Sequence, residues 1–384
     1  MLSVRSFSIV LVCLVIAFVL NKSENVVCND LCNFKTDEFI TYYGYEAEEH
    51  KITTDDGYIL TVFRCNSKKS STKTRKPLIV QHGLLLSSDD FATNMPGQAL
   101  AYVFADAGYD VFLANARGNA YSRNHTTKNA DDPSSGFWKF SWYEIGKYDH
   151  PALIDYVLKL TNRSKAYFIG HSQGGASLAI LLTERPEYNE KIHVASLLAP
   201  AFGLRRVGYF TEAFLIVGKI LQFFENSEAF PRSRMNKIIS KICTKVPYAC
   251  NVLVDFIMGP SENQRNDTML PVHVCHFPSG ISANQHLHFT QTILYEYFGK
   301  YKHGSNVPPE FPISRITAPI SFHLTTSDSL INVEYTTGMA SKFQNVVDVQ
   351  VINESAFNHI DYLWGIHAKS LVYSKILKIF EKFQ

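Results

Sequence analysis

The stretch Ala166-Tyr167-Phe168-Ile169-Gly170-His171-Ser172-Gln173-Gly174 decides the fold. Its apolar run leads into a Gly-x-Ser-x-Gly pentapeptide, and a helix-like run follows from residue 175. This order predicts a strand, a tight turn and a helix, with a strained turn that exposes the serine hydroxyl. The N-terminus of the helix would point at developing negative charge. We therefore expect Ser172 to be a nucleophile; the alternative is an ordinary glycine-rich turn.

A serine nucleophile requires a histidine base and a carboxylate that orients the base. In α/β-hydrolases the acid and then the base follow the serine, each in a loop after a later strand. Asp328 follows the apolar run 319–324, and His359 follows the run 347–352. The pattern predicts Asp328 as the acid and His359 as the base.

Three other carboxylates compete for the role of the acid: Asp361, Asp348 and Glu334. Asp361 is only two residues from His359, so it could not easily approach the far side of the ring. Asp348 precedes a strand instead of following one. Asp328 remains the preferred acid.

An oxyanion hole is predicted in the segment Gln81-His82-Gly83-Leu84-Leu85, which follows the apolar run 77–80. Gly83 would allow the backbone to approach the substrate closely. We assign the two donors to the backbone amides of Leu84 and Gln173. The alternative for His-Gly is a simple turn.

Short apolar runs alternate with helix-like stretches, which is typical of buried parallel strands joined by crossover helices. The expected strands are residues 58–63, 77–81, 110–114, 166–170, 193–198, 319–324 and 347–352, and the expected helices are residues 98–107, 149–160, a helix after Ser172, and residues 369–383. The sequence thus predicts an α/β-hydrolase fold with a mostly parallel central sheet.

The alternation stops between residues 201 and 316, where long apolar and aromatic stretches predict an inserted helical cap with a lid. The core is then expected in two parts, residues 21–200 and 317–384. The aromatic stripe 209–224 is interpreted mainly as packing inside the cap, with a lipid-facing lid as the alternative. The aromatic run 137–142 is also interpreted as packing.

Composition and charge exclude some classes of protein. With 46% hydrophobic residues the chain can bury a large core, and a formal net charge of +2 does not favour nucleic acid as a partner. Arg5 precedes an apolar stretch that is short for a membrane span, so residues 1–20 predict a signal peptide, with an uncleaved anchor as the alternative. No second long apolar segment follows, so we expect no stable transmembrane span.

Six cysteines follow the leader, an even number that favours disulfides in an exported chain. Cys243 and Cys250 could close a short loop, and Cys65 could pair with Cys28 or Cys32, although the spacing does not choose among the pairings. Four sequons also fit the secretory route and make glycosylation candidates of Asn124, Asn162, Asn266 and Asn353.

A metal site is not expected. His286 and His288 are two residues apart on a helix-like stretch, so their rings would not face one another, and no cysteine or carboxylate cluster accompanies them. The predicted chemistry needs no cofactor.

Several segments together resemble the acid lipase family, which includes gastric and lysosomal acid lipases, over nearly all of the chain after the leader. Besides the serine and His-Gly-Leu segments, the resemblance rests on Tyr43-Gly44-Tyr45, Asp55-Asp56-Gly57-Tyr58-Ile59-Leu60, Asn115-Ala116-Arg117-Gly118-Asn119, Phe137-Trp138, Phe140-Ser141, Lys147-Tyr148-Asp149, Asn358-His359-Ile360-Asp361-Tyr362, His288 and Gln291. It implies an α/β-hydrolase core with a cap and lid, no cofactor, and the triad Ser172, Asp328 and His359. It also implies a disulfide between Cys243 and Cys250.

The chain departs from the family pattern around the acid, where Thr325-Thr326-Ser327-Asp328 replaces a glycine-rich segment, so this loop could differ in shape. Met258 stands where relatives often carry a free cysteine. We expect a secreted or lysosomal hydrolase of neutral lipid esters, triacylglycerol or sterol ester, acting at a lipid–water interface. The rival hypotheses are a catalytically weak or silent lipid carrier on the same fold and a hydrolase of another ester.

Overall fold

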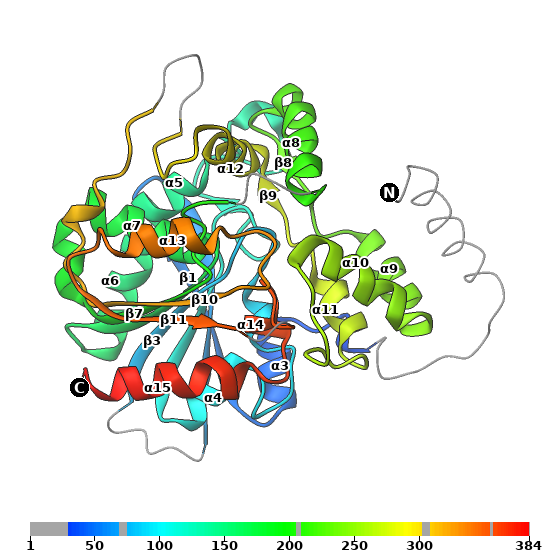
Figure 1. Cartoon of the computed structure of the whole chain (residues 1–384), viewed down its shortest axis with the longest axis horizontal. Coiled ribbons are helices and arrows are strands. Elements are labelled where there is room, and N and C mark those ends of the chain that lie inside the picture. Colours follow the sequence, from blue (N-terminus) through cyan, green and yellow to red (C-terminus); the bar gives the residue numbers. More distant parts are fainter. Residues whose placement is uncertain (1–29, 69–74, 205–208, 302–307, 354–355, 384) are drawn as a thin grey trace.

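The computed structural model describes residues 30–68, 75–204, 209–301, 308–353 and 356–383. The expected leader, residues 1–20, lies outside these ranges, as does Cys28. Within them a nine-stranded sheet forms the centre of the molecule, with helices on both of its faces (Figure 1). This is the α/β-hydrolase architecture that the alternation of apolar runs predicts.

The strands of this sheet lie in the order β1-β2-β4-β3-β6-β7-β10-β11, with β5 paired to β2. The β1–β2 and β2–β4 pairs are antiparallel, and each pairing from β4 across to β11 is parallel. Their bounds are β1 Glu46–Thr53, β2 Tyr58–Asn66, β3 Lys76–Gln81, β4 Tyr109–Ala114, β5 Asn124–His125, β6 Ala166–His171, β7 Ile192–Leu198, β10 Ile320–Thr325 and β11 Val346–Ile352.

Strand β1 is absent from the sequence prediction. It lies at the edge of the sheet and is largely exposed, and six of its eight residues are polar or charged. Charged residues protect an edge strand from pairing with other chains, but they also remove the apolar alternation by which a strand is recognised.

Helices cover both faces of the sheet. On one face Phe104 of α4 (Leu100–Asp106) packs against Phe380 of α15 (Ser374–Glu381), with the ring centroids 6.0 Å apart. Helices α6 (His150–Thr161) and α7 (Gln173–Glu184) lie on the other face (Figure 1). The remaining core helices are α3 Thr36–Tyr42, α5 Trp142–Glu144, α13 Val333–Ala340 and α14 Asp361–Trp364, and π-helical turns at Ile145–Asp149 and Lys369–Tyr373 lead into α6 and α15.

Residues 201–316, which we call the cap segment, leave the sheet after β7 and return to it at β10. Their helices are α8 Tyr209–Leu221, α9 Arg234–Lys245, α10 Pro247–Met258, α11 Leu270–His276 and α12 Ala283–Tyr295, and they lie above and to the right of the sheet in Figure 1. The cap segment also holds a small sheet of β8 (Glu228–Ala229) and β9 (Ile281–Ser282). The sequence predicts the helices of this segment but not these two strands, because two-residue strands leave no periodic pattern.

Two disulfides are present in the described residues. Cys243 is bonded to Cys250, as the family resemblance implies, and Cys32 is bonded to Cys275. Cys65 is free and buried in β2. The suggested Cys65–Cys32 pairing is therefore wrong, because Cys32 is bonded instead to a residue that follows it by 243 positions and that the fold brings close.

Exposure distinguishes the four sequons. Asn124, Asn162 and Asn353 are exposed, whereas Asn266 is partly buried. None of the helices within the described ranges is long and apolar enough to cross a membrane.

Candidate active site

Ser172 lies in the sharp turn between β6 and α7. Its backbone has φ 53° and ψ −116°, a strained conformation for a residue with a side chain. The turn is held by the Ser172 amide, which donates to the carbonyl of Leu198 at 2.8 Å, and by the amide of Ala176, which donates back to the carbonyl of Ser172 at 3.2 Å. The turn thus has the strained geometry of a nucleophile elbow.

The two glycines of the pentapeptide permit close packing around this turn. A Cβ atom at Gly170 would lie 2.7 Å from the amide nitrogen of Gly175. A Cβ atom at Gly174 would lie 2.5 Å from the carbonyl oxygen of Gln81. Both contacts are too short for a side chain, so the motif requires glycine at both positions.

Asp328 and His359 lie together, as the order of strands predicts. His359 Nδ1 donates to Asp328 Oδ2 at 2.7 Å, and both side chains are almost fully buried. The other carboxylate oxygen, Oδ1, accepts from the amides of Leu330 at 2.7 Å and Ile331 at 2.9 Å. These bonds fix the carboxylate, and the carboxylate fixes the ring through Nδ1.

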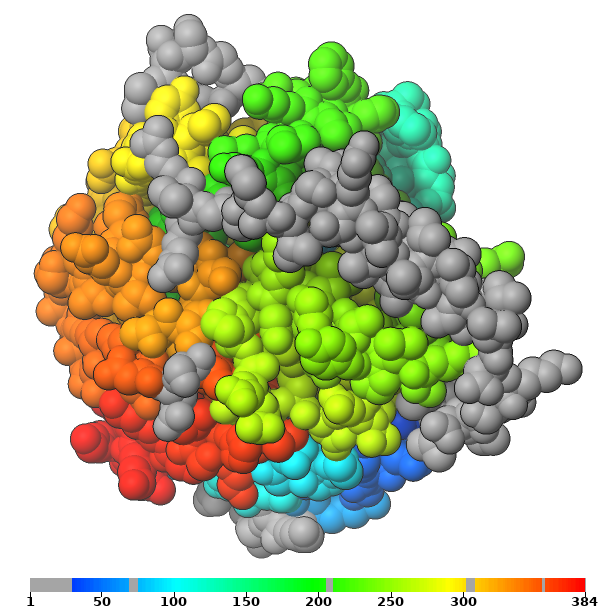
Figure 2. Space-filling view, turned by 45° about the vertical axis from the view of Figure 1, so that its right-hand side comes forward, coloured from blue at the N-terminus to red at the C-terminus, as the bar shows by residue number. Residues whose placement is uncertain are grey.

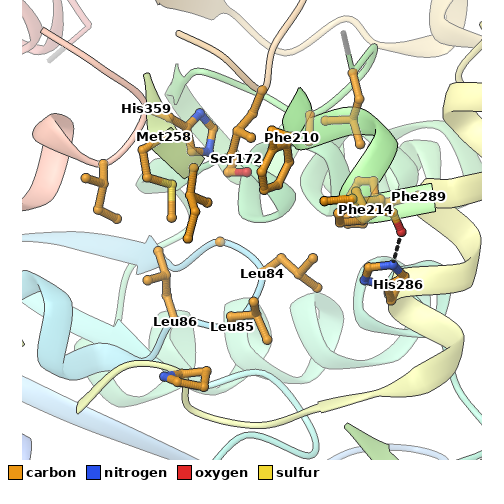
Figure 3. Close-up of a pocket in the computed structure, with 18 of the residues that line it drawn as sticks. Leu84, Leu85, Leu86, Ser172, Phe210, Phe214, Met258, His286, Phe289 and His359 are labelled. Atoms are coloured by element: carbon orange, nitrogen blue, oxygen red, sulfur yellow. Dashed lines mark hydrogen bonds between the residues drawn. The ribbon is translucent and has the colours of Figure 1, made fainter. Parts of the chain in front are cut away.

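Ser172 and His359 line the same cavity (Figure 3). No hydrogen bond joins the Ser172 hydroxyl to His359 within the part of the chain that the structure describes. Hydrogen bonds between catalytic groups are often long before substrate binds and shorten in the complex. Ser172 and His359 therefore share the cavity, and Asp328 contacts His359, without a bond between the serine and the histidine.

The predicted oxyanion loop lies against Ser172. A Cβ atom at Gly83 would lie 3.0 Å from the Cβ atom of Ser172, so the loop reaches the serine only because Gly83 has no side chain. Gln173 is the first residue of α7, where an amide has no acceptor within the helix. Leu84 lines the cavity beside the serine.

His82 supports this loop. Burial lowers the pKa of His82 to about 4, which keeps the ring neutral. The ring then donates from Nδ1 to the carbonyl of Gly83 at 2.7 Å and accepts at Nε2 from the amide of Ala116 at 3.1 Å. The sequence marks His82 only as part of a turn, and the structure identifies it as a support for the loop.

Two further residues hold His359 and were missed in the sequence. His171 donates from Nε2 to the carbonyl of His359 at 2.9 Å, and burial lowers the pKa of His171 well below its ordinary value. On the other side, the amide of His359 donates to the carbonyl of Met258 at 3.4 Å. A position inside a Gly-x-Ser-x-Gly motif could have drawn attention to His171, but no sequence signal points to a backbone carbonyl.

The rival carboxylates have other partners. Asp361 accepts from the amide of Asn358 at 2.8 Å, and burial raises the pKa of the Asp361 carboxyl to about 6. Asp348 pairs with Lys375 at 2.8 Å, and Glu334 lies in the first turn of α13. Among the described residues Asp328 is the carboxylate that contacts His359.

The altered acid loop is bonded to the base loop. Thr325 Oγ1 donates to the carbonyl of Phe357 at 2.6 Å, and Asp328 still reaches His359. The unusual Thr-Thr-Ser segment therefore does not move the acid away from the base.

The cavity in front of Ser172 has a volume of about 440 Å³ and almost entirely apolar walls. Leu84, Leu85 and Leu86 form one side, and Phe210, Phe214 and Phe289 face them from the cap segment (Figure 3). His286 is the one polar ring that Figure 3 labels on the cap side, and it donates to the carbonyl of Phe214 at 2.9 Å. Burial lowers the pKa of His286 to about 4, so the wall carries no charge there.

The aromatic stripe 209–224 is divided between two surfaces. Phe210 and Phe214 line the cavity, whereas Phe223 and Phe224 are exposed. The interpretation of this stripe mainly as packing is therefore wrong. The run 137–142 is packing as expected, because Phe137, Trp138, Phe140 and Trp142 are all buried.

His286 and His288 do not share a ligand position. The ring of His288 donates from Nε2 to the carbonyl of Gly299, accepts at Nδ1 from the Ser141 hydroxyl, and stacks on Trp142 with a centroid distance of 3.8 Å. Across the described ranges, no group of three or more His, Cys, Asp or Glu side chains is placed to hold a metal ion.

Three of the segments that carry the family resemblance meet in one buried ion network. Arg117 is 1% exposed, and its guanidinium pairs with Asp149 and Asp56, each at 2.6 Å. The ring of Tyr58 lies against the same guanidinium, 4.0 Å from its carbon to the ring centroid. These motifs therefore stabilise the core beside the site and do not line the cavity.

Two family models match the chain. One is described as the alpha/beta hydrolase fold and matches residues 76–366, and the other, a partial alpha/beta-hydrolase lipase region, matches residues 36–95. Lipase 1 of Drosophila melanogaster is 36% identical over 90% of this chain and 79% of its own length. The lysosomal acid lipase/cholesteryl ester hydrolase of Homo sapiens is 31% identical over 92% of each chain, and the gastric triacylglycerol lipase of Mus musculus is 30% identical over 91% and 92%.

The chain belongs to the acid lipase family. It is a carboxylic ester hydrolase of the lipase type. Solved structures agree in fold: a monoglyceride lipase variant from Saccharomyces cerevisiae has a TM-score of 0.60 at 13% identity, over 92% of this chain and 98% of that one. The carboxylesterase CesB from Bacillus subtilis has a TM-score of 0.52 at 12% identity, over 93% and 97%.

Proposed function

We propose that this acid lipase hydrolyses neutral lipid esters, triacylglycerol or sterol ester, through an acyl-enzyme on Ser172. The observation that carries the proposal is the buried 2.7 Å bond between His359 and Asp328 at the wall of an apolar cavity that Ser172 also lines. The names of the relatives support it, since one is a cholesteryl ester hydrolase and another a triacylglycerol lipase.

In the first half of the reaction, His359 Nε2 removes the proton of the Ser172 hydroxyl as the oxygen attacks the ester carbonyl. The carbonyl oxygen becomes an oxyanion, which the amides of Leu84 and Gln173 stabilise. The carbon–oxygen bond to the alcohol then breaks, and His359 returns the proton to the leaving alcohol. The fatty acyl group stays bonded to Ser172.

In the second half, His359 takes a proton from water, and the hydroxide attacks the acyl carbonyl. The bond to Ser172 Oγ breaks, the proton returns to the serine, and the fatty acid leaves. Asp328 stabilises the imidazolium at both stages and holds the Nδ1–H tautomer. Its two backbone amide donors, from Leu330 and Ile331, keep the carboxylate in place throughout.

The outer surface of the cap segment supports action at a lipid–water interface. Phe223 is 87% exposed and Tyr248 is 79% exposed, and α10 lies at the surface in the middle of the space-filling view (Figure 2). Other exposed apolar side chains on α8, α9 and α10 include Ile216, Ile220, Met235, Ile238, Ile239 and Val252. Apolar groups gathered on a surface mark an interaction site. A lipid surface is the partner that also supplies the substrate.

The two disulfides support delivery through the secretory pathway, to the lysosome or the extracellular space. The exposed sequon residues Asn124, Asn162 and Asn353 suit glycosylation on that route.

The proposal is tested by measuring hydrolysis of emulsified trioleoylglycerol and cholesteryl oleate by purified wild type and Ser172→Ala. We expect the variant to lose about 10⁴-fold or more in kcat. Ser314→Ala, at an exposed serine near the end of the cap segment, is the matched control and should retain full activity. Binding of either lipid by the wild type without hydrolysis would instead support the carrier hypothesis. Hydrolysis of short soluble esters alone would favour another ester as substrate.

A further inference from the structure

The carboxyl end of α10 both lines the cavity and contacts the loops that carry Asp328 and His359. Leu253, Phe256, Ile257 and Met258 line the cavity, so the last turns of the helix are part of its wall. The helix ends at Met258, and the backbone of Met258 and Gly259 contacts the loops that carry Asp328 and His359. This contact joins the cap segment to both loops of the core.

One carbonyl serves both loops. The carbonyl oxygen of Met258 accepts from the amide of Ser329 at 3.3 Å and from the amide of His359 at 3.4 Å. Ser329 is the neighbour of Asp328 in the chain. A shift of this carbonyl would therefore move the backbones of the acid loop and the base loop together.

Gly259 adds a second anchor. Its carbonyl accepts from Asn358 Nδ2 at 2.6 Å, and Asn358 is wholly buried beside the base. Gly259 has φ 109°, and a Cβ atom there would lie 2.1 Å from the carbonyl oxygen of Ser327. The acid loop thus packs against Gly259 so closely that no other residue fits without displacement of that loop.

His359 is consequently held from two sides. Its amide donates to Met258 of the cap segment, and its carbonyl accepts from His171 of the core. The Asp328 carboxylate is oriented by amides of its own loop, so its direction follows the backbone of residues 327–331. We infer that Met258 and Gly259 position the acid and the base for the reaction, an inference that rests on the proposed function.

The test is Gly259→Ala in the full-length protein, assayed with p-nitrophenyl butyrate, a soluble ester that needs no lipid surface. We expect kcat to fall between about tenfold and a hundredfold, because small displacements of catalytic groups have effects of this size, while KM changes less than about threefold. Rates are calculated per site titrated with an organophosphonate, which corrects for unfolded protein. Gly338→Ala is the matched control, since Gly338 is exposed on α13 with no atom near the added Cβ, and its kcat should not change.

Proton NMR distinguishes an effect on the positions of His359 and Asp328 from a loss of overall stability. The proton shared by His359 and Asp328 should give a far-downfield proton NMR signal in the wild type, and this signal should weaken or shift in Gly259→Ala but not in Gly338→Ala. If the wild type hydrolyses no ester, the proposed function fails, and the NMR signal still reports whether Gly259 controls the contact.

Asn358→Ala serves as a second variant, because it removes an anchor without placing a methyl group against Ser327. We expect a decrease of kcat in the same direction but smaller, about threefold to tenfold. An unchanged kcat and NMR signal in both variants would overturn the inference. A change in KM with an unchanged kcat would also overturn it, because it would show that α10 affects only substrate binding, as part of the cavity wall.

Discussion

The core and the cap segment of this lipase differ in which groups they bury and which they expose. In the core, charged groups are buried and paired, as in the Arg117–Asp149 ion pair and the His359–Asp328 hydrogen bond. In the cap segment, apolar groups face open space on both sides: Phe210 faces the cavity and Phe223 faces solvent. Paired polar groups fix atoms in place, whereas uncovered apolar groups leave a surface for an apolar partner. Under the proposed function, the core carries the chemistry and the cap segment carries the lipid contact.

The largest effect is expected from a change to the hydrogen bond between Asp328 and His359 in the core. Asp328→Asn should lower kcat about 10⁴-fold, because an amide holds the histidine in the wrong tautomer. Asp361→Asn should lower it less than about tenfold, because an asparagine oxygen can still accept from the Asn358 amide. The measurement is kcat on a soluble ester under identical conditions. Similar losses in the two variants would show that the choice of Asp328 over its rival is mistaken.

The next prediction compares how much each of the two disulfides stabilises the protein. Cys32–Cys275 ties the start of the core to the cap segment across 243 residues, whereas Cys243–Cys250 closes a loop of 7 residues within the cap segment. In the chain-entropy description, paired serine substitutions at the first bond should destabilise the protein by about 5 kcal/mol and at the second by about 2 kcal/mol. Thermal unfolding of the two double variants provides the comparison. A larger loss from the short loop would mean that the cap segment depends on its own bond more than on its tie to the core.

The sequence predicts the core better than the cap segment, for physical reasons. Buried parallel strands leave continuous apolar runs, so the strands before Ser172, Asp328 and His359 could be located along with the residues that follow them. Contacts made by backbone atoms depend little on residue type, so they leave no pattern in the sequence. The carbonyl of Met258 and the bond from Cys32 to Cys275 depend on segments that only the folded chain brings together.

The cap segment shows the limit of apolar patterns most clearly. Helix α8 carries apolar residues toward both the cavity and solvent, so the sequence alone could not separate a face that lines a cavity from one that meets solvent. Phe214 and Phe223 lie in the same stretch of sequence and face different surroundings.

A smaller effect concerns the boundary between the two regions, where Asp361 is buried. Burial raises the pKa of the Asp361 carboxyl from 3.8 to about 6 in the folded protein. The folded state therefore binds more protons than the unfolded state between these values, so the contribution of Asp361 to stability falls as pH rises through this window. Asp361→Asn removes that dependence. The stability of the variant relative to the wild type should rise by about 2 kcal/mol between pH 4 and pH 7.

Chemical unfolding of both proteins at the two pH values measures this difference directly. The variant also loses or weakens hydrogen bonds, but that change is the same at each pH and cancels. An equal difference at pH 4 and pH 7 would mean that folding does not raise the pKa of the Asp361 carboxyl.

The smallest effect concerns the outer face of the cap segment. Phe223 is 87% exposed, so Phe223→Ser should leave folding and the hydrolysis of a soluble ester unchanged. Its adsorption to trioleoylglycerol emulsion should fall about fivefold, since partial burial of an aromatic ring in lipid contributes about 1 kcal/mol. Leu160→Ser, at an exposed apolar residue on α6 of the core, is the control and should adsorb as the wild type does. Equal losses in both variants would mean that the protein adsorbs through scattered apolar residues and that the cap segment has no special part in lipid contact.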